Sequence, residues 1–99
     1  MFTIEYDEDV VNDLDDLRAH NRKRILDEVE AQLFHQPTPQ TRNRKLLPGL
    51  EPPWEHAEPV WELRIGEYRV FYDVDEIAQV VKIRAIRHKP PHKTTEEII

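Results

Sequence analysis

Hydrophobic and polar positions alternate with two different periods along the chain. Phe2, Ile4 and Tyr6 are separated by polar residues, which predicts a short strand with one apolar face. Two stretches at helical spacing follow, one with Val10, Val11, Leu14 and Leu17 and the other with Ile25, Leu26, Val29, Leu33 and Phe34. The first third of the chain is therefore expected to form a strand and two helices.

Polar residues mark the expected ends of these helices. Asp7 or Asp9 can cap the first helix, and the acids of its first turn suit the helix dipole. His20 and Asn21 predict a break, after which Asn21 caps the second helix and Pro37 ends it. So short a break predicts an antiparallel helical hairpin.

The second half of the chain returns to the period of a strand. Residues 35–59 contain six prolines, so we expect a long, ordered or semi-ordered connection there with no long regular element. Three strands are expected after it, over residues 60–65, 68–73 and 77–87. Each combines alternating side chains with β-branched or aromatic residues, as a half-buried sheet requires.

Turn residues and prolines separate these strands. Gly66-Glu67 predicts the first tight turn and Asp75-Glu76 the second. Pro90-Pro91 ends the sheet, and residues 94–99 are expected to form a short helical tail capped by Thr94 or Thr95. The predicted order is β-α-α-β-β-β within one domain, 1–99. This is an α+β fold in which a helical hairpin covers one face of a small, mainly antiparallel sheet.

The outward positions of the three strands carry an unusual number of bases. Arg64, Arg69, Lys82 and Arg84 alternate with apolar residues and can share a face with Phe71. A basic surface with an aromatic plane suits the phosphates and bases of a nucleic acid. The alternative is that these are ordinary solvated side chains, each paired with a neighbouring acid such as Glu62, Glu67 or Asp73.

Charge distribution supports such a surface although the chain carries a net charge of −6. Residues 1–36, with ten acids and four bases, account for all of it, and residues 77–95 are mainly basic. The chain has no cysteine, no pattern of a signal peptide and no apolar run long enough to cross a membrane. We therefore expect a cytoplasmic protein without disulfides.

Two smaller groups of residues have possible chemical roles. Arg42, Arg44 and Lys45 form a basic cluster in the long connection, which can bind RNA backbone or simply be solvated. Trp54 and Trp61 can stack on bases, although Trp61 alternates with apolar residues as a core side chain does. His88 and His92 are four residues apart, but Pro90-Pro91 prevents the helix that would align them, so neither a metal site nor a cofactor is expected.

The order of elements and one long pattern resemble a known family. The pattern is Trp61-Glu62-Leu63-Arg64-Ile65-Gly66-Glu67-Tyr68-Arg69-Val70-Phe71-Tyr72, followed by the ending Ile86-Arg87-His88-Lys89. In this respect the chain resembles toxins of the RelE/ParE superfamily, the toxin half of type II toxin–antitoxin pairs. The resemblance implies a cognate antitoxin, which also links the toxin to operator DNA. It further implies either ribosome-dependent cleavage of mRNA without a metal or inhibition of DNA gyrase.

The resemblance also assigns roles to residues. Arg69 matches the arginine that contacts the scissile phosphate, Arg64 matches a basic residue on the preceding strand, and Lys89 or Arg87 matches a second catalytic arginine. Two lysines of the RelE pattern are replaced by Val60 and Glu62, and the tyrosine of the tail is absent.

His88 or His92 can replace that tyrosine, because an imidazole titrates near neutrality. The expected catalytic residues are thus Arg69, Arg64, His88, Lys89 and His92. The expected RNA-binding residues are Arg42, Arg44, Lys45, Lys82, Arg84, Arg87 and Phe71.

Three functions compatible with this pattern stay open. The first is an RNase toxin acting on translated mRNA, and the second is a gyrase inhibitor of the same fold, which the missing lysines and tyrosine favour. The third is an inactive member that only binds its antitoxin. The discriminating feature is whether the tail folds back to bring His88 or His92 near Arg69, because acid–base catalysis requires that proximity.

Overall fold

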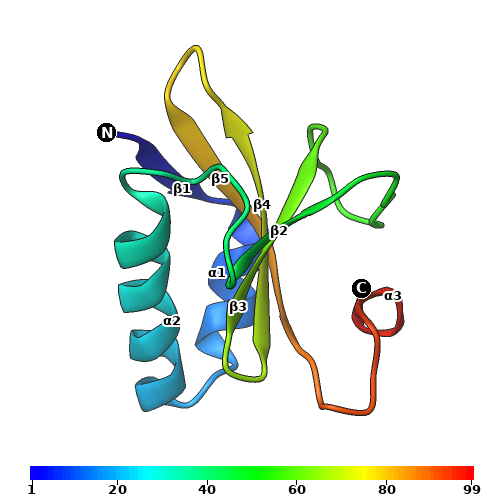
Figure 1. The fold of residues 1–99 in the computed structure, drawn as a ribbon. Coiled ribbons are helices and arrows are strands. Elements are labelled where there is room, and N and C mark those ends of the chain that lie inside the picture. The colour runs from blue at the N-terminus through cyan, green and yellow to red at the C-terminus, as the bar shows by residue number, and fades with distance from the viewer.

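The computed structural model describes all 99 residues and contains five strands and three helices (Figure 1). In chain order they are β1 Thr3–Tyr6, α1 Glu8–Asp15, α2 Ala19–Leu33, β2 Arg44–Leu47, β3 Val60–Ile65, β4 Tyr68–Asp75, β5 Val80–His88 and α3 Thr95–Ile98. None of the helices has both the length and the apolar character needed to span a bilayer.

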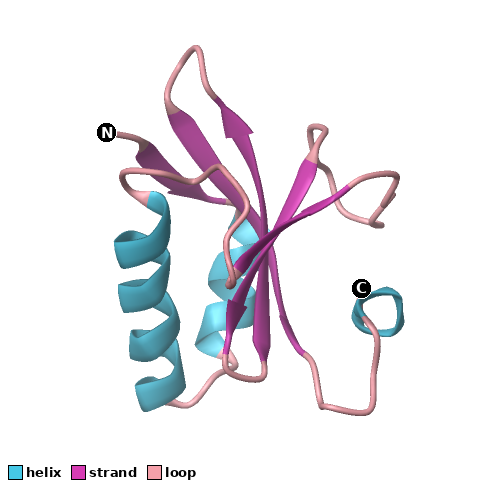
Figure 2. Ribbon diagram, in the orientation of Figure 1, coloured by secondary structure: helices cyan, strands magenta, loops and turns pink.

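The strands form one mixed sheet in the order β1-β5-β4-β3-β2. β1 pairs with β5 in parallel, and the other three pairs are antiparallel. Figure 2 shows the sheet nearly edge-on, with α1 and α2 on one side and α3 on the other. The predicted α+β fold, with a helical hairpin on one face of a mainly antiparallel sheet, is confirmed.

The main core lies between the helical hairpin and the sheet. α2 contributes Ile25, Val29 and Leu33, which are four residues apart and so lie on one face of the helix. The sheet contributes a layer of alternating side chains, including Leu63, Val70, Tyr72 and Ile83. These positions follow the strand-like and helix-like periods from which the elements were predicted.

The break between the two helices was predicted too late in the chain. α1 ends at Asp15 and α2 begins at Ala19, after Arg18 in extended conformation. The acids that end α1 are unfavourable at the negative end of the helix dipole, which explains the earlier stop. Asn21 lies inside α2, where its amide is 3.4 Å from the Tyr68 hydroxyl instead of capping the helix.

The long connection contains a strand that was not expected. β2 is only four residues long and pairs with β3, so the predicted order β-α-α-β-β-β lacks one strand. Arg44 fixes the start of β2 because its guanidinium donates to the carbonyl oxygens of Gln32, at 2.6 Å in the last turn of α2, and of Gln36, just after the helix. Tyr72 also holds this connection, because its buried hydroxyl donates to the Pro37 carbonyl at 2.7 Å.

A β-bulge in β5 changes which face its side chains occupy. The register shifts between Phe71 and Tyr72, which pair with Ala85 and Ile83 respectively, so Arg84 is the extra residue. Ile86 therefore joins the main core, and Ala85 lies on the opposite face with Phe71. Strict alternation along β5 would place Ala85 on the face of Val81 and Ile83, and the bulge is the reason why it does not.

Candidate functional site

Arg69 lies at the start of β4, directly after a tight turn. Gly66 adopts a left-handed conformation, with φ of 58°, which glycine accepts without strain. The Arg69 guanidinium folds back on this turn and donates through Nη1 to the carbonyl oxygens of Gly66, at 2.9 Å, and Tyr68, at 2.8 Å. Neither acceptor carries a formal charge, so these bonds hold the side chain without neutralising it.

The surroundings of Arg69 leave its charge only partly balanced. Burial lowers the pKa of the guanidinium, Glu62 opposes this effect, and Arg64 adds to it. Arg64 lies directly opposite Arg69 on the neighbouring strand. The nearest acid is Glu62, whose Oε1 is 3.8 Å from Arg69 Nε. Arginine stays protonated at neutral pH despite such a shift, so the site keeps an excess of positive charge.

A cavity of about 250 Å³ opens beside these residues. No hydrophobic side chain lines it. Its lining residues come from the connection before β2, from β2, β3 and β4, and from the chain after β5, and they are Arg42, Asn43, Lys45, Glu62, Arg64, Arg69, Lys89 and Thr95. With five bases and one acid, the cavity is suited to a phosphate group.

Five residues predicted from sequence thus lie together. Three are expected catalytic residues, Arg69, Arg64 and Lys89, and two are expected RNA-binding residues, Arg42 and Lys45. They come together because β3 and β4 pair in register and β2 adds Lys45 directly opposite Glu62. Their roles in catalysis and RNA binding stay predictions.

Neither histidine lines the cavity. His88 lies on the face of β5 that bears the main core, where its Nε2 is 3.0 Å from Glu67 Oε1 and its ring is 5.4 Å from that of Tyr68. His92 is exposed in the turn after β5. The tail does fold back, but it brings Thr95 to the site instead of an imidazole.

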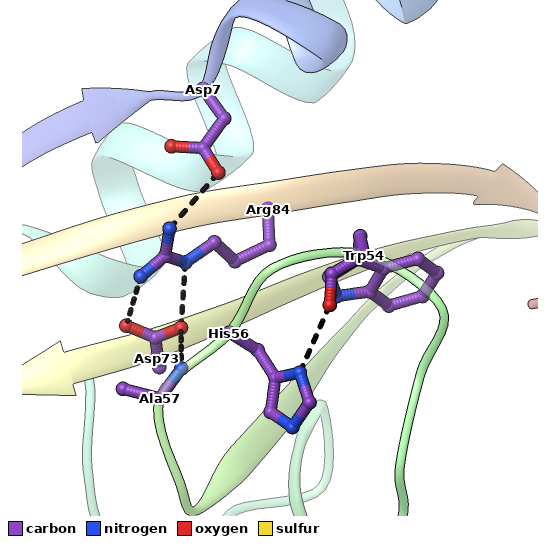
Figure 3. A network of polar contacts seen from close by, with 6 residues as sticks. All are labelled: Asp7, Trp54, His56, Ala57, Asp73 and Arg84. Atoms are coloured by element: carbon purple, nitrogen blue, oxygen red, sulfur yellow. Dashed lines mark hydrogen bonds and ion pairs between the residues drawn. The ribbon is translucent and has the colours of Figure 1, made fainter.

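Arg84 belongs to a second polar cluster, drawn in Figure 3. Its guanidinium donates to both carboxylate oxygens of Asp73, at 2.7 and 3.3 Å, and to Asp7 at 3.1 Å. These bonds raise its pKa against the opposing effect of burial. Asp73 also accepts the backbone N–H of Ala57 at 3.0 Å, so the cluster holds the connection between β2 and β3.

The prediction that Arg84 and Lys82 extend an exposed basic face is therefore wrong in part. Arg84 is neutralised by two carboxylates, and Lys82 lies directly opposite Asp73 in the sheet. Asp7, expected as a cap of α1, makes no side-chain cap bond because its carboxylate binds Arg84. The alternative interpretation, that outward bases pair with neighbouring acids, describes this end of the sheet.

Three further residues from the expected RNA-binding group are engaged elsewhere. Phe71 is fully buried beneath Trp54 and the C-terminal residues, so the expected exposed aromatic plane is wrong. Arg44 is buried and binds carbonyl groups at the end of α2. Arg87 donates to Asp13 at 3.2 Å and lies over the ring of Trp54, 5.1 Å from its centroid.

Sequence reasoning missed three members of the cavity, Asn43, Glu62 and Thr95. Glu62 was considered as the replacement of an expected lysine and as an acid that can pair with an outward base, but not as a site residue, yet it is 7% exposed and faces Arg69. Thr95 was considered only as a helix cap, yet its hydroxyl donates to Glu62 at 2.8 Å. Alternation along β3 places Glu62 on the same face as Arg64, so Glu62 could have been found from the sequence. Thr95 could not, because nothing in the sequence shows where the tail docks.

A family model for the ParE toxin of type II toxin–antitoxin systems matches residues 4–89. The chain belongs to this toxin family, within the RelE/ParE superfamily. The match begins in β1 and extends through Lys89, so it includes every lining residue of the cavity except Thr95. No significant match was found among curated proteins.

Solved structures of other toxins share the fold of this toxin. The archaeal RelE–RelB complex from Pyrococcus horikoshii OT3 is similar with a TM-score of 0.69 and 24% identity, covering 94% of this chain and 98% of that one. The toxin–antitoxin complex RelBE2 from Mycobacterium tuberculosis gives 0.69 and 20%, covering 89% and 98%. The isolated E. coli RelE toxin gives 0.68 and 16%, covering 98% and 94%.

Proposed function

We propose that this toxin is an endoribonuclease that cleaves ribosome-bound mRNA by means of its own side chains. The observation that carries the proposal is the cavity, in which five bases surround a single carboxylate. Bases alone would bind RNA backbone. A carboxylate at 3.8 Å from the central arginine adds a group that can accept a proton.

The reaction needs one bond to form and one to break. The ribose 2′-oxygen attacks the adjacent phosphorus while its proton passes to the Glu62 carboxylate. The bond from phosphorus to the 5′-oxygen breaks, and that oxygen takes a proton from Lys89. The products are a 2′,3′-cyclic phosphate and a 5′-hydroxyl end, and the proton balance between the two side chains is restored through solvent.

Arg69 and Arg64 have the electrostatic role in this scheme. Negative charge grows on the non-bridging phosphate oxygens as the bond to phosphorus forms, and fixed guanidinium groups stabilise it without reorganising. Arg69 is held by the turn carbonyls, so it is in place before RNA binds. Arg42 and Lys45 are exposed at the edge of the cavity and suit the neighbouring phosphates.

The test is primer extension on a reporter mRNA in an active bacterial translation extract. The wild-type toxin should produce discrete cuts, and Arg69→Ala should reduce their rate by about 100-fold or more, as loss of a donor to a developing oxyanion does. Arg18→Ala is the matched control, because Arg18 is exposed at the start of α2 and its side chain lies outside the cavity. An intact message with folded wild-type toxin would reject the proposal.

One observation favours a second function. The family model that matches is that of the ParE toxins, and the sequence resemblance links such members to inhibition of DNA gyrase. A supercoiling assay with purified gyrase separates the two functions. Inhibition at low toxin concentration, combined with an intact message in the extract, would support the gyrase function instead.

The partner expected for either function is a cognate antitoxin. Two of the similar structures are complexes of a toxin with its antitoxin. An antitoxin that neutralises the cavity should carry acidic residues or block access to Arg69. Co-expression with the neighbouring coding sequence, followed by purification of the pair, tests this expectation.

A further inference from the structure

The C-terminal segment docks on the face of the sheet opposite the helical hairpin. Figure 1 shows α3 on this side, separated from α1 and α2 by the sheet. Ile98 and Ile99 pack against an apolar cluster of Val60, Phe71 and Ala85. This contact gives α3 a defined position on the sheet, although none of its own residues is fully buried.

The start of α3 is fixed by a capping box. The Thr94 side chain accepts from the backbone of Glu97, and the Glu97 carboxylate accepts the Thr94 backbone N–H at 2.9 Å. Hydrogen bonds from the backbone and the side chain of Thr94 to the Glu97 carboxylate lower the pKa of Glu97, so the carboxylate is ionised and the box is present at neutral pH. Thr94 is therefore occupied by the cap, and the next hydroxyl, that of Thr95, is free to bind elsewhere.

The Thr95 hydroxyl is directed to the carboxylate of the cavity. It donates to Glu62 Oε2 at 2.8 Å, while Glu62 Oε1 is the oxygen nearest Arg69, at 3.8 Å. The two oxygens of the carboxylate thus have different neighbours. A glutamate side chain has three rotatable bonds, so a bond to one oxygen restricts where the other one points.

We infer that Thr95 is a positioning residue, which holds Glu62 with Oε1 towards Arg69 and the substrate phosphate. The inference rests on the ribonuclease function proposed above. It makes the docked tail a part of the active site, because the hydroxyl reaches Glu62 only while α3 is seated on the apolar cluster. The structure provides no other donor to Oε2 within hydrogen-bonding distance.

The test compares three variants in the translation extract. Thr95→Val keeps the shape of the side chain but removes the hydroxyl, and Thr95→Ser keeps the hydroxyl. Thr38→Val is the control for the same chemical change, since Thr38 binds Glu76 at a distant site. The maximal cleavage rate at saturating toxin and the toxin concentration at half-saturation are measured separately.

A positioning role predicts a particular division of effects. Thr95→Val should lower the maximal rate by about 10- to 100-fold, because small displacements of a reacting group have effects of this size. The half-saturating concentration should change less than about threefold, Thr95→Ser should restore most of the rate, and Thr38→Val should behave as wild type. Full activity of Thr95→Val, with cleavage still dependent on Arg69, would overturn the inference and leave the proposed function intact.

A measurement without RNA separates positioning from a purely structural effect. In the full chain labelled with ¹³C, the side-chain carboxyl signal of Glu62 should shift in Thr95→Val and return in Thr95→Ser, with the signals of α3 unchanged. A loss of rate with an unmoved Glu62 signal, or with α3 displaced, would overturn the inference. If wild-type toxin leaves the message intact, the proposed function fails, and the positioning role fails with it.

Discussion

Arg69 and Arg84 lie on neighbouring strands, and their side chains are 9% and 10% exposed, yet they are in opposite electrostatic states. Arg84 binds two carboxylates, which raise its pKa. Arg69 binds two uncharged carbonyl groups, its one carboxylate neighbour, Glu62, is 3.8 Å away, and burial lowers its pKa. The first arrangement neutralises the charge of arginine within the protein, and the second balances that charge only in part. Charge balance rather than exposure therefore distinguishes a structural arginine from a candidate catalytic one.

The difference between the two arginines is tested most strongly by removing each charge in turn. Arg84→Met leaves Asp73 as a buried carboxylate without its main partner, so we expect the free energy of unfolding to fall by about 3 kcal/mol. Arg69→Met should cost less than half as much, because its pair with Glu62 is longer, 3.8 Å against 2.7 Å for Arg84 and Asp73, and Glu62 keeps its bond to Thr95. Urea unfolding of both variants measures the difference.

Activity should change in the reverse order. Cleavage per folded Arg84→Met molecule should stay near the wild-type rate, because Arg84 does not line the cavity. Equal loss of stability in the two variants would contradict the assignment of Arg84 as the structural member of the pair.

Tyr72 holds a connecting segment through a neutral hydroxyl, whereas Asp73 holds one through a charged carboxylate. Burial raises the pKa of Tyr72, although Arg44 opposes this effect, so its hydroxyl stays neutral in the folded state. An unfolded tyrosine ionises near pH 10, so the stability due to Tyr72 is complete below that pH and is lost as the pH rises towards the folded-state pKa. The pKa of Tyr6 is also raised by burial and then by Glu30, and it contributes in the same direction.

Replacing Tyr72 with Phe should reveal this effect. At pH 8 the variant should be less stable by about 1 kcal/mol, because the bond to the Pro37 carbonyl is lost. Between about pH 9 and pH 11 it should lose less stability than wild type, because one ionisable group is absent. Urea unfolding of both proteins at pH 8 and across the range from about pH 9 to pH 11 measures this. An equal loss of unfolding free energy in the two proteins would show that Tyr72 does not control the alkaline transition.

Two lysines, one at each end of the sheet, test the same difference through RNA binding. Lys45→Ala should weaken binding of a non-cleavable 2′-O-methyl RNA several-fold and reduce the slope of log Kd against log salt by about 0.7, the value for one phosphate contact on a single strand. Lys82→Ala should leave the slope unchanged, because Lys82 lies opposite Asp73, away from the cavity. Fluorescence anisotropy at four salt concentrations gives both slopes, and identical slopes would remove the distinction between the two ends of the sheet.

The sequence predicted the elements whose hydrophobic periods are long and uninterrupted. α2, β3 and β4 fall where their apolar positions indicated, with the differences confined to their ends. β2 was missed because its four residues are too few to show a period and stand between prolines. The bulge at Arg84 was missed because a bulge is defined by the partner strand, where one residue lies opposite two. The sequence of β5 alone does not show which residue has no partner.

The candidate site was predictable to the extent that alternation within strands determines it. Arg64 and Arg69 follow from the pattern of β3 and β4, and their direct pairing follows from the Gly66 turn. Arg84 could not be separated from Arg69 by sequence, because Asp7, its second partner, is 77 positions away and Asp73 reaches it only across the strand pair. The contact of Thr95 with Glu62 depends on the docking of the tail, which no local pattern encodes.

The pairing of β1 with β5 has a consequence for how the molecule is made. β1 contains the first residues of the sheet and β5 the last, and the two are hydrogen-bonded neighbours. During synthesis β1 therefore has no partner until β5 has emerged. Such non-local pairing slows folding, because the loop must close before the contact stabilises it. The cavity needs Lys89 and Thr95 from beyond β5, so it cannot form before this strand and the segment after it have been made.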